Sequence, residues 1–342
     1  MVKRVSLVKG DNRHVNVKRA LELIGPDLEN IANKKSILLK PNLTATKLRP
    51  DANTHVDAVR AILDFLRERV TGFDQKEVVI AEGSGSAYYE ATTTWEIFRD
   101  FGYEDLVQSY PNVKLEAVED YKSFSPIPIN SFAGPENMML ADRIKDFDYK
   151  ISINLPKVHN YAMVTFGIKN MMGMIRQEDK SMVHGLKTPS APNVPNIFNI
   201  VPTKLISWMR RRTPGLVNAL FKHSATYMKA VKVIHYNVTE MAKLAWPDLV
   251  VLDGLYGMDG NGPVDGYPVK LGAAIASTDP LKADGLAARL IGLQPEDVGY
   301  LYYLSEAGMG DYSLDGLVGE ELSPLIKKFK MHPTFPIQKE WQ

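Results

Sequence analysis

The sequence predicts an α/β fold: a mainly parallel sheet with helices on both faces, plus a helical basic insert. Three observations lead to this prediction. Short apolar runs alternate with segments of helical period, several of these runs end directly in polar residues, and one long segment lacks acidic residues altogether. Strand–helix–strand units at such spacing form parallel sheets with right-handed crossovers.

The composition fits a globular protein of one large or two modest domains, with 342 residues, 45% of them apolar and 24% charged. The formal net charge of +1 gives no overall field that would select nucleic acid, so we expect no nucleic-acid partner. Without cysteine, the chain has no disulfide, no thiolate nucleophile and no iron–sulfur cluster on cysteine ligands. The N-terminus lacks the long apolar run of a signal peptide, and a cytoplasmic location is expected.

The first half of the chain supplies the alternating elements in order. The apolar runs predict strands at residues 4–8, 36–39, 78–81 and 113–118, and the helical periods predict helices at residues 15–24, 56–66 and 95–101. Thr54 and Asp57 resemble a capping box, with Asp in place of Glu, at the start of the second helix. The proline-rich segment 123–135 is expected to be irregular, and residues 141–147 are expected to form a helix.

The main site signal follows a central strand predicted at residues 149–155. A proline ends this apolar, β-branched run, and Lys157 and His159 come next. A short helix with Lys169 and Asn170 follows within a few residues. Open α/β folds bind ligands at the carboxyl edge of the sheet, so these side chains indicate a site there. The alternative is a solvated loop after a strand.

Other predicted strands end in polar groups at the same edge. Lys40 and Asn42 follow the second strand, and Glu82 follows the third, just before a Gly-Ser turn that contains Ser84. The amides of that turn could cradle an anion, or the residues could form an ordinary tight turn. Asp253 follows a later strand directly. Because parallel strands end at one edge, these groups are expected to converge although they are distant in sequence.

Residues 186–234 differ from the rest of the chain. Between Asp179 and Glu240 there is no acidic residue, whereas basic residues include the Arg run 210–212. We interpret the segment as a helical lid or subdomain that covers an anionic substrate, docks a partner or makes membrane-surface contact. A helical hairpin packed on the core is the alternative. The chain then divides into three parts: an α/β core formed by residues 1–185 and 235–342, and the insert 186–234.

The last part of the chain resumes the alternation. A Gly-rich acidic loop at residues 258–266 follows the next strand and contains Asp259 and Asn261. It departs from a calcium-binding loop, because Pro263 stands where a ligand is needed and the distal Glu is missing. We then expect a strand, a helix capped by Asp279 and a mostly helical tail.

The predicted site residues fall into three sets by role. The catalytic set is His159, Lys157, Glu82 and Lys169. The substrate-binding set is Lys40, Asn42, Ser84, Asn170 and Asn261. The metal-ligand set is His159, His184, Asp253 and Asp259. We expect one cleft with Asp253 and Asp259 on its opposing wall, lined by Lys40, Glu82, Lys157, His159, Lys169, Asn170 and His184.

These residue types favour proton transfer on a small anionic substrate that bears a carboxylate or phosphate. Lysines at strand ends can hold anions, donate protons when desolvated or form Schiff bases. Our first hypothesis is an isomerase-, lyase- or hydrolase-like enzyme, with or without a divalent metal. The second is an enzyme that uses a bound cofactor for redox or racemase chemistry. The third is a non-catalytic ligand- or partner-binding protein.

Four blocks of sequence resemble the DUF362 family. They are Leu39-Lys-Pro-Asn-Leu43, Asn154-Leu-Pro-Lys157 with His159, Gly167-Ile-Lys-Asn170 with Gly173, and Asp253-Gly254 with Met258-Asp-Gly-Asn-Gly-Pro263. The resemblance runs in the same order from about Lys35 to Gly292. DUF362 is a domain family of unknown function, found alone or fused to ferredoxin-like modules. The resemblance therefore implies a domain type, here a variant without cysteines or an iron–sulfur module, and assigns no residue roles.

Overall fold

A central mixed sheet organises the molecule. A computed structural model describes residues 2–85, 92–132, 134–185, 212–213, 216 and 225–342. Within these residues the sheet has ten strands, eight of them in the order β12-β1-β11-β10-β7-β2-β3-β4, with β8 and β9 attached beside β10. The strands are β1 (Val5–Lys9), β2 (Ser36–Lys40), β3 (Glu77–Glu82), β4 (Val113–Ala117), β7 (Tyr149–Asn154), β8 (Lys157–His159), β9 (Met163–Thr165), β10 (Leu249–Asp259), β11 (Tyr267–Ser277) and β12 (Leu317–Gly319).

Most neighbouring strands run parallel. The run β10-β7-β2-β3-β4 is parallel throughout, and β11 lies antiparallel between β10 and β1. Three of these strands, β2, β3 and β7, are five or six residues long and almost wholly buried, as strands covered on both faces are. The prediction of a mainly parallel α/β fold is confirmed.

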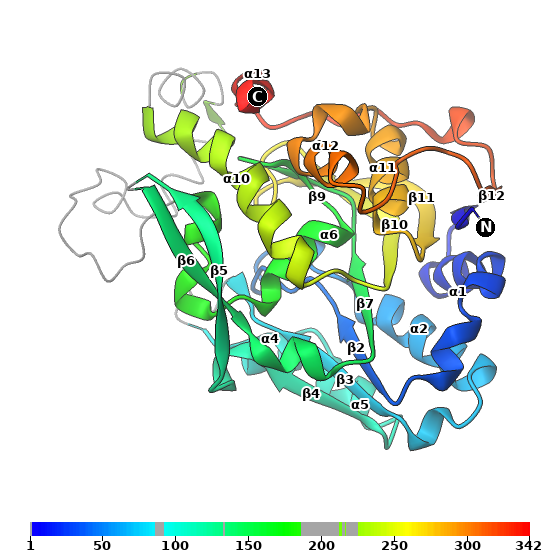
Figure 1. Ribbon diagram of the computed structural model, residues 1–342. Helices are drawn as coiled ribbons and strands as arrows, with labels where there is room; N and C mark the ends of the chain where they lie inside the picture. Colours follow the sequence, from blue (N-terminus) through cyan, green and yellow to red (C-terminus); the bar gives the residue numbers. More distant parts are fainter. Residues whose placement is uncertain (1, 86–91, 133, 186–211, 214–215, 217–224) are drawn as a thin grey trace.

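Helices cover both faces of the sheet (Figure 1). One face packs against α1 (Arg13–Leu23), α2 (Val56–Arg69), α4 (Thr94–Asp100) and α5 (Tyr103–Val107). The other packs against α6 (Gly167–Asn170), α10 (Ala225–Leu244), α11 (Pro280–Leu290) and α12 (Gly299–Glu306). Alternate strand residues face opposite sides, so Ile37 and Leu39 join the first core and Leu38 joins the second.

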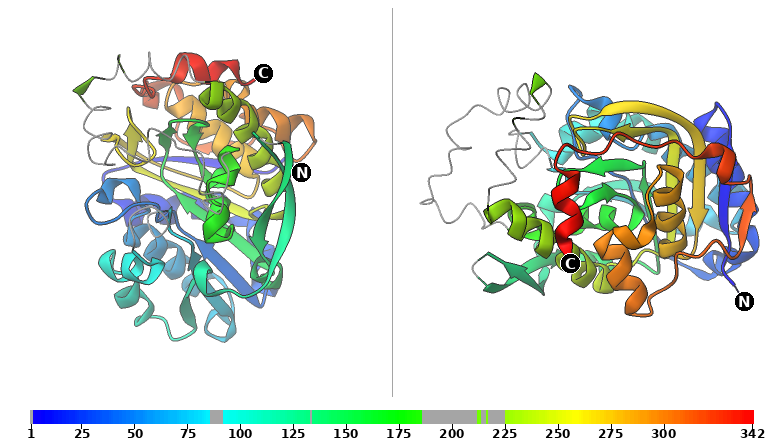
Figure 2. Two further views of the ribbon diagram at one scale, coloured as in Figure 1. Left: turned by 90° about the vertical axis from the view of Figure 1, so that its left-hand side faces the viewer. Right: turned by 90° about the horizontal axis from the view of Figure 1, so that it is seen from above.

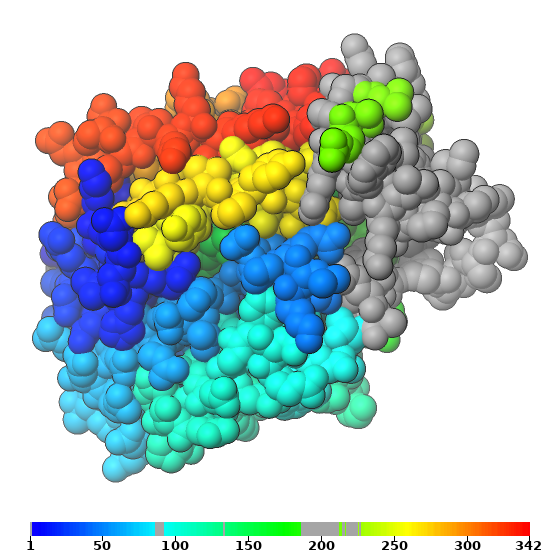
Figure 3. All heavy atoms as spheres, turned by 180° about the vertical axis from the view of Figure 1, so that it is seen from behind, coloured from blue at the N-terminus to red at the C-terminus, as the bar shows by residue number. Residues whose placement is uncertain are grey.

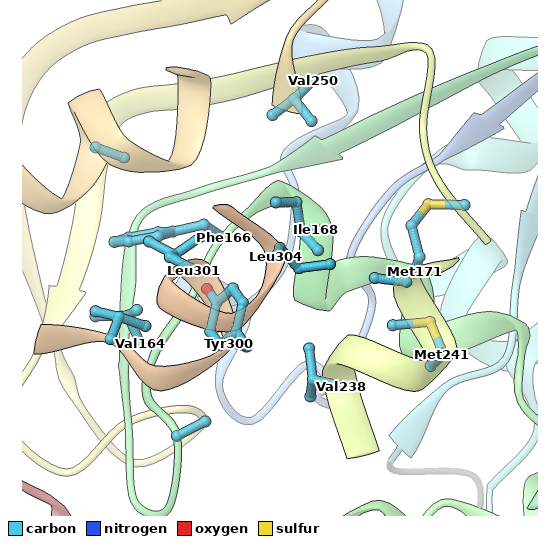
Figure 4. Close-up of a cluster of buried hydrophobic side chains, with 14 of the residues drawn as sticks. Val164, Phe166, Ile168, Met171, Val238, Met241, Val250, Tyr300, Leu301 and Leu304 are labelled. Atoms are coloured by element: carbon cyan, nitrogen blue, oxygen red, sulfur yellow. The ribbon is translucent and has the colours of Figure 1, made fainter. Parts of the chain in front are cut away.

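The second core surrounds the short helix α6. Figure 4 shows Ile168 of α6 among side chains from α10 and α12, including Val238 and Leu304. Phe166, immediately before the helix, lies fully buried beside Leu301. A helix of four residues has little stability of its own, so this apolar packing is what holds α6 in place.

The segment expected to be irregular is instead a β-hairpin of β5 (Phe124–Ser131) and β6 (Gly134–Ala141). The prediction of an irregular segment rested on its prolines and is wrong. Pro126 and Pro128 occupy exposed positions of β5, while Ile127 and Ile129 between them are buried. A two-stranded ribbon has free edges that tolerate residues without an amide hydrogen. Figure 2 shows the hairpin running beside α10, against which β5 packs.

Two predicted helix starts also differ. The N-cap of α2 is His55, not Thr54, because the Thr54 hydroxyl is used elsewhere. It accepts a hydrogen bond from the Asn42 amide at 2.9 Å and donates to the Ile153 carbonyl at 2.9 Å. Residues 141–147 form only a short 3₁₀ helix, Asp142–Asp146.

The C-terminal tail follows the β10–β11 ribbon. Figure 3 shows the tail, in red, lying along this ribbon, in yellow. The Gly260 amide donates to the Lys330 carbonyl at 2.6 Å, and the Phe329 amide donates to the Ile291 carbonyl at 3.0 Å. The tail ends in a short helix α13 (Phe335–Gln338), and the Gln338 amide group donates to the His159 carbonyl at 3.1 Å. The tail therefore helps to hold the segment that carries His159.

Most of the predicted insert, residues 186–211 and 217–224, lies outside the described residues, so the three-part division of the chain stays a prediction. The flanking parts share one sheet, because β10 and β11 lie between β7 and β1. In the described part, none of the helices combines the length and apolarity that a bilayer crossing requires.

A glycine contact at the start of α6 gives a first prediction. A Cβ at Gly167 would overlap both methyl groups of Val250. We therefore expect Gly167→Ala to lower the free energy of unfolding by about 1–3 kcal/mol through overpacking. Val250→Ala removes the obstructing methyl groups, so the double variant should lose less stability than the sum of the two single losses, as measured by urea denaturation. Strict additivity would show that this contact does not constrain α6.

Candidate functional site

A buried ion pair joins the ends of β2 and β3. The Lys40 ammonium contacts the Glu82 carboxylate at 2.5 Å and donates to the Pro41 carbonyl at 2.7 Å. Glu82 also accepts from the amides of Leu43 and Gly83. The Lys40 side chain is fully buried, and burial lowers its pKa although Glu82 acts in the opposite direction. Each group has the partners that a buried charge needs.

Gly173 closes this pair from the other side. A Cβ at Gly173 would overlap the Glu82 carboxylate and the end of the Lys40 side chain. The segment after α6 therefore approaches the ion pair at backbone distance, which only glycine permits. This contact explains why a glycine follows the Lys169–Asn170 helix at this spacing.

Two asparagines connect the ion pair to the central strand. Asn170 of α6 donates to the Lys40 carbonyl at 2.8 Å and to the Ser152 hydroxyl at 3.0 Å. Its side-chain oxygen accepts from the Asn42 amide at 2.9 Å. Asn42 and Asn170 are both buried. Their hydrogen bonds connect β2, β7 and α6, and their predicted role in substrate binding stays a prediction.

Lys157 lies in the same network with its hydrogen bonds largely satisfied. Its ammonium donates to the Asn42 side-chain oxygen at 2.6 Å and to the Ala52 carbonyl at 2.8 Å. It is fully buried, and burial, assisted by the nearby Lys169 charge, lowers the pKa of Lys157 to about 7. Neutral oxygens hold this lysine, and no carboxylate hydrogen-bonds to it in the described part of the chain.

Helix α6 is clamped at its first turn by groups from two elements. The Asp284 carboxylate of α11 accepts from the Gly167 amide at 2.8 Å and from the Ile168 amide at 3.0 Å. From β7, the Ser152 hydroxyl donates to the Gly167 carbonyl at 2.7 Å, and Asn154 donates to the Phe166 carbonyl at 3.0 Å. Burial raises the pKa of Asp284 to about 7, although the two amides favour its ionised form. The clamp fixes where α6 presents its side chains.

Lys169 is the side chain that this clamp presents. It is 5% exposed, and no hydrogen bond or ion pair joins its ammonium to any other described residue. Burial alone lowers the pKa of Lys169 to about 7. Its charge in turn lowers the pKa values of His159, His184, His235 and Lys157, so Lys169 lies among these groups. An ammonium without a counter-ion in such a place favours an anion as its partner.

His159 is held in one tautomer by its own turn. Its Nδ1 accepts from the amides of Tyr161 at 3.0 Å and Ala162 at 3.1 Å. Burial, followed by the Lys169 charge, holds the pKa of His159 well below its ordinary value, so the imidazole is neutral at pH 7. With Nδ1 accepting, the single ring proton lies on Nε2. His159 is therefore a hydrogen-bond donor toward a ligand rather than a base.

A second histidine lies against the first. The rings of His159 and His184 stack, with centroids 5.6 Å apart and planes inclined by 9°. Burial lowers the pKa of His184 to about 3. Nearby, the Lys180 ammonium donates to the Gly173 carbonyl at 3.1 Å, and burial lowers the pKa of Lys180 to about 8.

Positive charge is in excess throughout this cluster. Lys40 has Glu82 as its partner, whereas Lys157, Lys169 and Lys180 have no carboxylate bonded to them among the described residues. The segment between Asp179 and Glu240 contains no carboxylate side chain that could pair with these lysines. Outside the described residues, the sequence contains a single acidic residue, Glu90. Each uncompensated amine pays a desolvation penalty that a bound anion would offset.

Two acids placed on the opposing wall by the sequence analysis lie elsewhere, which corrects that prediction. Strand β10 does not end at Asp253 but shifts register after Gly254 and continues to Asp259. Asp253 therefore falls within the strand, on the face covered by α1, and forms an ion pair with Arg13. Asp259 is half-buried and accepts from the Lys330 amide at 3.1 Å.

The four predicted metal ligands, His159, His184, Asp253 and Asp259, consequently do not form one site. Across the described ranges, no three His, Asp or Glu side chains are grouped so that they could hold a metal ion. Within the part of the chain that the structure describes, the stacked pair His159–His184 has no carboxylate grouped with it, and Asp253 is paired with Arg13 on the opposite face of the sheet.

The remaining substrate-binding predictions fall at the margin of the cluster. Ser84 is buried beyond Glu82, its amide donates to the Thr94 hydroxyl at 2.9 Å, and its carbonyl accepts from Gln177 at 2.6 Å. Asn261 lies half-buried in the loop after β10. An Arg49–Asp265 ion pair of 2.5 Å ties that loop to the segment whose Ala52 carbonyl binds Lys157.

The three predicted sets of site residues leave out three groups that shape the site: Asp284, Ser152 and Lys180. Asp284 is inside a helix and Ser152 inside an apolar strand, so neither follows a strand end. The apolar surroundings of a lone Asp at position 284 were the available signal, because a carboxylate on the buried side of a helix needs hydrogen-bond donors.

Comparisons with known proteins show which family the chain resembles. The model of the DUF362 family, described as a domain of unknown function, matches residues 37–289. The thylakoid-associated protein sll1697 of Synechocystis sp. is 25% identical over 304 residues, which cover 87% of this chain and 77% of that protein. Among solved structures, the lactate racemase apoprotein from Thermoanaerobacterium thermosaccharolyticum aligns with a TM-score of 0.48 and 16% identity, over 83% of this chain and 56% of that chain.

The two lysines Lys40 and Lys169 should respond oppositely to the same substitution. Lys40→Met leaves the Glu82 carboxylate buried without its cation, and we expect a loss of about 3–5 kcal/mol in the free energy of unfolding. Lys169→Met removes a buried charge without a described partner, so we expect a gain of about 1–4 kcal/mol at pH 7. Chemical denaturation of both variants measures these changes.

The stability that Lys169→Met gains over the wild-type protein should decrease as pH rises above 7. The pKa of Lys169 is about 7 in the folded protein, below its value in the unfolded chain, so the unfolded chain binds more protons between these two values. Wild-type stability therefore rises with pH above 7 relative to Lys169→Met, and the advantage of the variant shrinks. A destabilised Lys169→Met protein would contradict the absence of a compensating partner.

Proposed function

The chain belongs to the DUF362 family, and from its site we propose an enzyme that binds a small carboxylate- or phosphate-bearing substrate and transfers protons at the carboxyl edge of the sheet. One observation carries the proposal. Lys169 is buried without a partner in the described part of the chain, among other cationic or donor groups. An anionic ligand supplies the charge that this arrangement lacks.

We assign a different role to each of Lys157, His159 and Lys169. Lys157, fixed by Asn42 and Ala52, provides a positioned positive charge for the anionic group. His159 offers its Nε2 proton to a ligand oxygen, because its Nδ1 already accepts two amides. Lys169 is the group that takes up and releases a proton, since its pKa of about 7 leaves both forms populated near neutral pH.

Lys40 and Glu82 support this site without joining the chemistry. Their pair is enclosed by Gly173 and the Asn170 network, and both side chains are committed to one another. Glu82, predicted as a catalytic residue, is proposed here to fix the ends of β2 and β3. The pair sets the distance between the segment that carries Asn42 and the helix that carries Lys169.

Anion binding can be measured before the substrate is known. Inorganic phosphate, compared with chloride at equal ionic strength, should raise the thermal midpoint of the wild-type protein, with about 1.4 kcal/mol of stabilisation at ten times Kd. The effect should weaken above pH 7 to 8, because Lys157 and Lys169 lose their protons there. Lys169→Met should abolish most of it.

Lys76 supplies a matched control for that experiment. It is another buried lysine, but its ammonium donates to the Ala32 and Lys34 carbonyls, away from the site. Lys76→Met should keep the phosphate-induced shift. An equal loss of the shift in Lys76→Met and Lys169→Met, or no shift in the wild-type protein with phosphate or with acetate, would refute the anion-binding site.

A second proposal concerns the acid-free segment between Asp179 and Glu240. Its basic residues, with no acidic residue in the same segment, favour contact with an anionic membrane surface, and a relative at 25% identity is named for its association with thylakoids. Vesicles containing phosphatidylserine should sediment the protein, and phosphatidylcholine vesicles should not. Arg211→Glu should weaken sedimentation, whereas Lys47→Glu, at an exposed lysine outside the segment, should not. Equal binding to both kinds of vesicle would exclude this electrostatic contact.

A further inference from the structure

We infer a further activity for the same site: the Lys169 amine adds to the carbonyl carbon of an anionic aldehyde or 2-oxo acid and forms an imine. The inference rests on the proposed function, because anion binding brings the carbonyl group to this lysine. It names a narrower class of ligand, one that carries a carbonyl next to its anionic group.

The first argument comes from a comparison of the four lysines of the cluster. Lys40 is bound to Glu82, Lys157 to Asn42 and the Ala52 carbonyl, and Lys180 to the Gly173 carbonyl. These hydrogen bonds use protons of each amine and fix the direction in which it points. Lys169 has no such bond to another described residue, so its nitrogen is the one available for reaction.

The surroundings of Lys169 favour the uncharged, nucleophilic amine. The side chain is 5% exposed, and no carboxylate is bonded to it within the described residues. A lysine desolvated beside other cationic groups loses its proton readily, which is a recognised way to activate an amine for imine formation. The pKa of about 7 that burial gives Lys169 is consistent with this, since about half of the amine is then free at neutral pH.

The two other parts that imine formation needs are also present. Lys157 is held in place by two neutral oxygens and offers a positive charge for the ligand's carboxylate or phosphate. His159 offers a proton on Nε2, fixed by the two amides at Nδ1, and can donate it to the carbonyl oxygen. His159 and Lys157 both lie within electrostatic reach of Lys169.

The geometry of α6 keeps the amine in position. The Asp284 carboxylate accepts hydrogen bonds from the amides of Gly167 and Ile168. Side chains of β7 donate hydrogen bonds to the carbonyls of Phe166 and Gly167. Lys169 therefore extends from a backbone fixed at both sides of its first turn. Such fixation reduces the entropy lost when the amine meets the carbonyl carbon.

The reaction balances without an oxidant or reductant. The lone pair of the Lys169 nitrogen forms a bond to the carbonyl carbon, and the carbonyl oxygen takes a proton to give a carbinolamine. The nitrogen releases its extra proton, the hydroxyl group leaves as water after protonation, and a carbon–nitrogen double bond forms. The net change is amine plus carbonyl compound to imine plus water.

Reductive trapping tests the inference on the intact protein. Pyruvate with sodium cyanoborohydride should convert the imine into a stable secondary amine, and peptide mass spectrometry should find one reduced adduct, predominantly on Lys169. Acetone is the matched probe, with the same carbonyl and no carboxylate, and should label Lys169 at least tenfold less. Phosphate should compete with pyruvate, and labelling should rise with pH to half its maximum near pH 7.

Variants separate this adduct from general lysine chemistry. Lys169→Arg keeps a positive charge but has no nucleophilic amine, so it should abolish the specific adduct. Lys76→Arg should retain it. An adduct spread equally over surface lysines, or labelling by pyruvate and acetone at equal rates, would overturn the inference.

Failure of imine formation can be distinguished from failure of the proposed anion site by combining the pyruvate and phosphate experiments. If phosphate stabilises the wild-type protein while pyruvate leaves Lys169 unlabelled, imine formation is excluded and the anion site stands. If phosphate has no effect and Lys169 is unlabelled, both proposals fail. A Lys169 adduct that phosphate suppresses supports both.

Discussion

The burial of lysine amines at one edge of a sheet is the constraint on which the rest of this structure depends. Lys40, Lys157, Lys169 and Lys180 are all withdrawn from water, and among the described residues one carboxylate, Glu82, is bonded directly to one of them. Such an arrangement is costly to an empty protein. The network of asparagines, backbone carbonyls and glycine contacts around these amines exists to keep them apart and in place.

Local backbone hydrogen bonds fix the orientation of the groups around these buried lysines. The turn after β8 supplies the amides that fix the His159 tautomer, and the start of α6 receives its hydrogen bonds from Asp284 and β7. The same kind of backbone contact thus fixes the tautomer of His159 and the position of the helix that carries Lys169. Neither property belongs to the residue type alone.

Opposite charges in this region share a similar titration range. Burial raises the pKa of Asp284 to about 7 and lowers the pKa values of Lys157 and Lys169 to about 7. The ionised carboxylate costs stability as pH rises from about 4 to 7, and the charged lysines cost stability until pH rises above 7. Near neutral pH the protein therefore bears both costs, a pattern that is common at functional sites.

The sequence by itself determined the parallel α/β class, the strand ends at Lys40, Glu82 and Lys157, and the family, because apolar periodicity and residue order are local properties. The sequence could not determine which side chains from distant segments pair with one another. Asp253 and Lys157 each follow an apolar run, yet only the continuation of β10 beyond Gly254 sends Asp253 to Arg13 on the opposite face. Likewise Asp284 is an ordinary helical aspartate until α11 packs against α6. Those outcomes depend on strand register and on helix packing between distant segments, which tertiary structure alone decides.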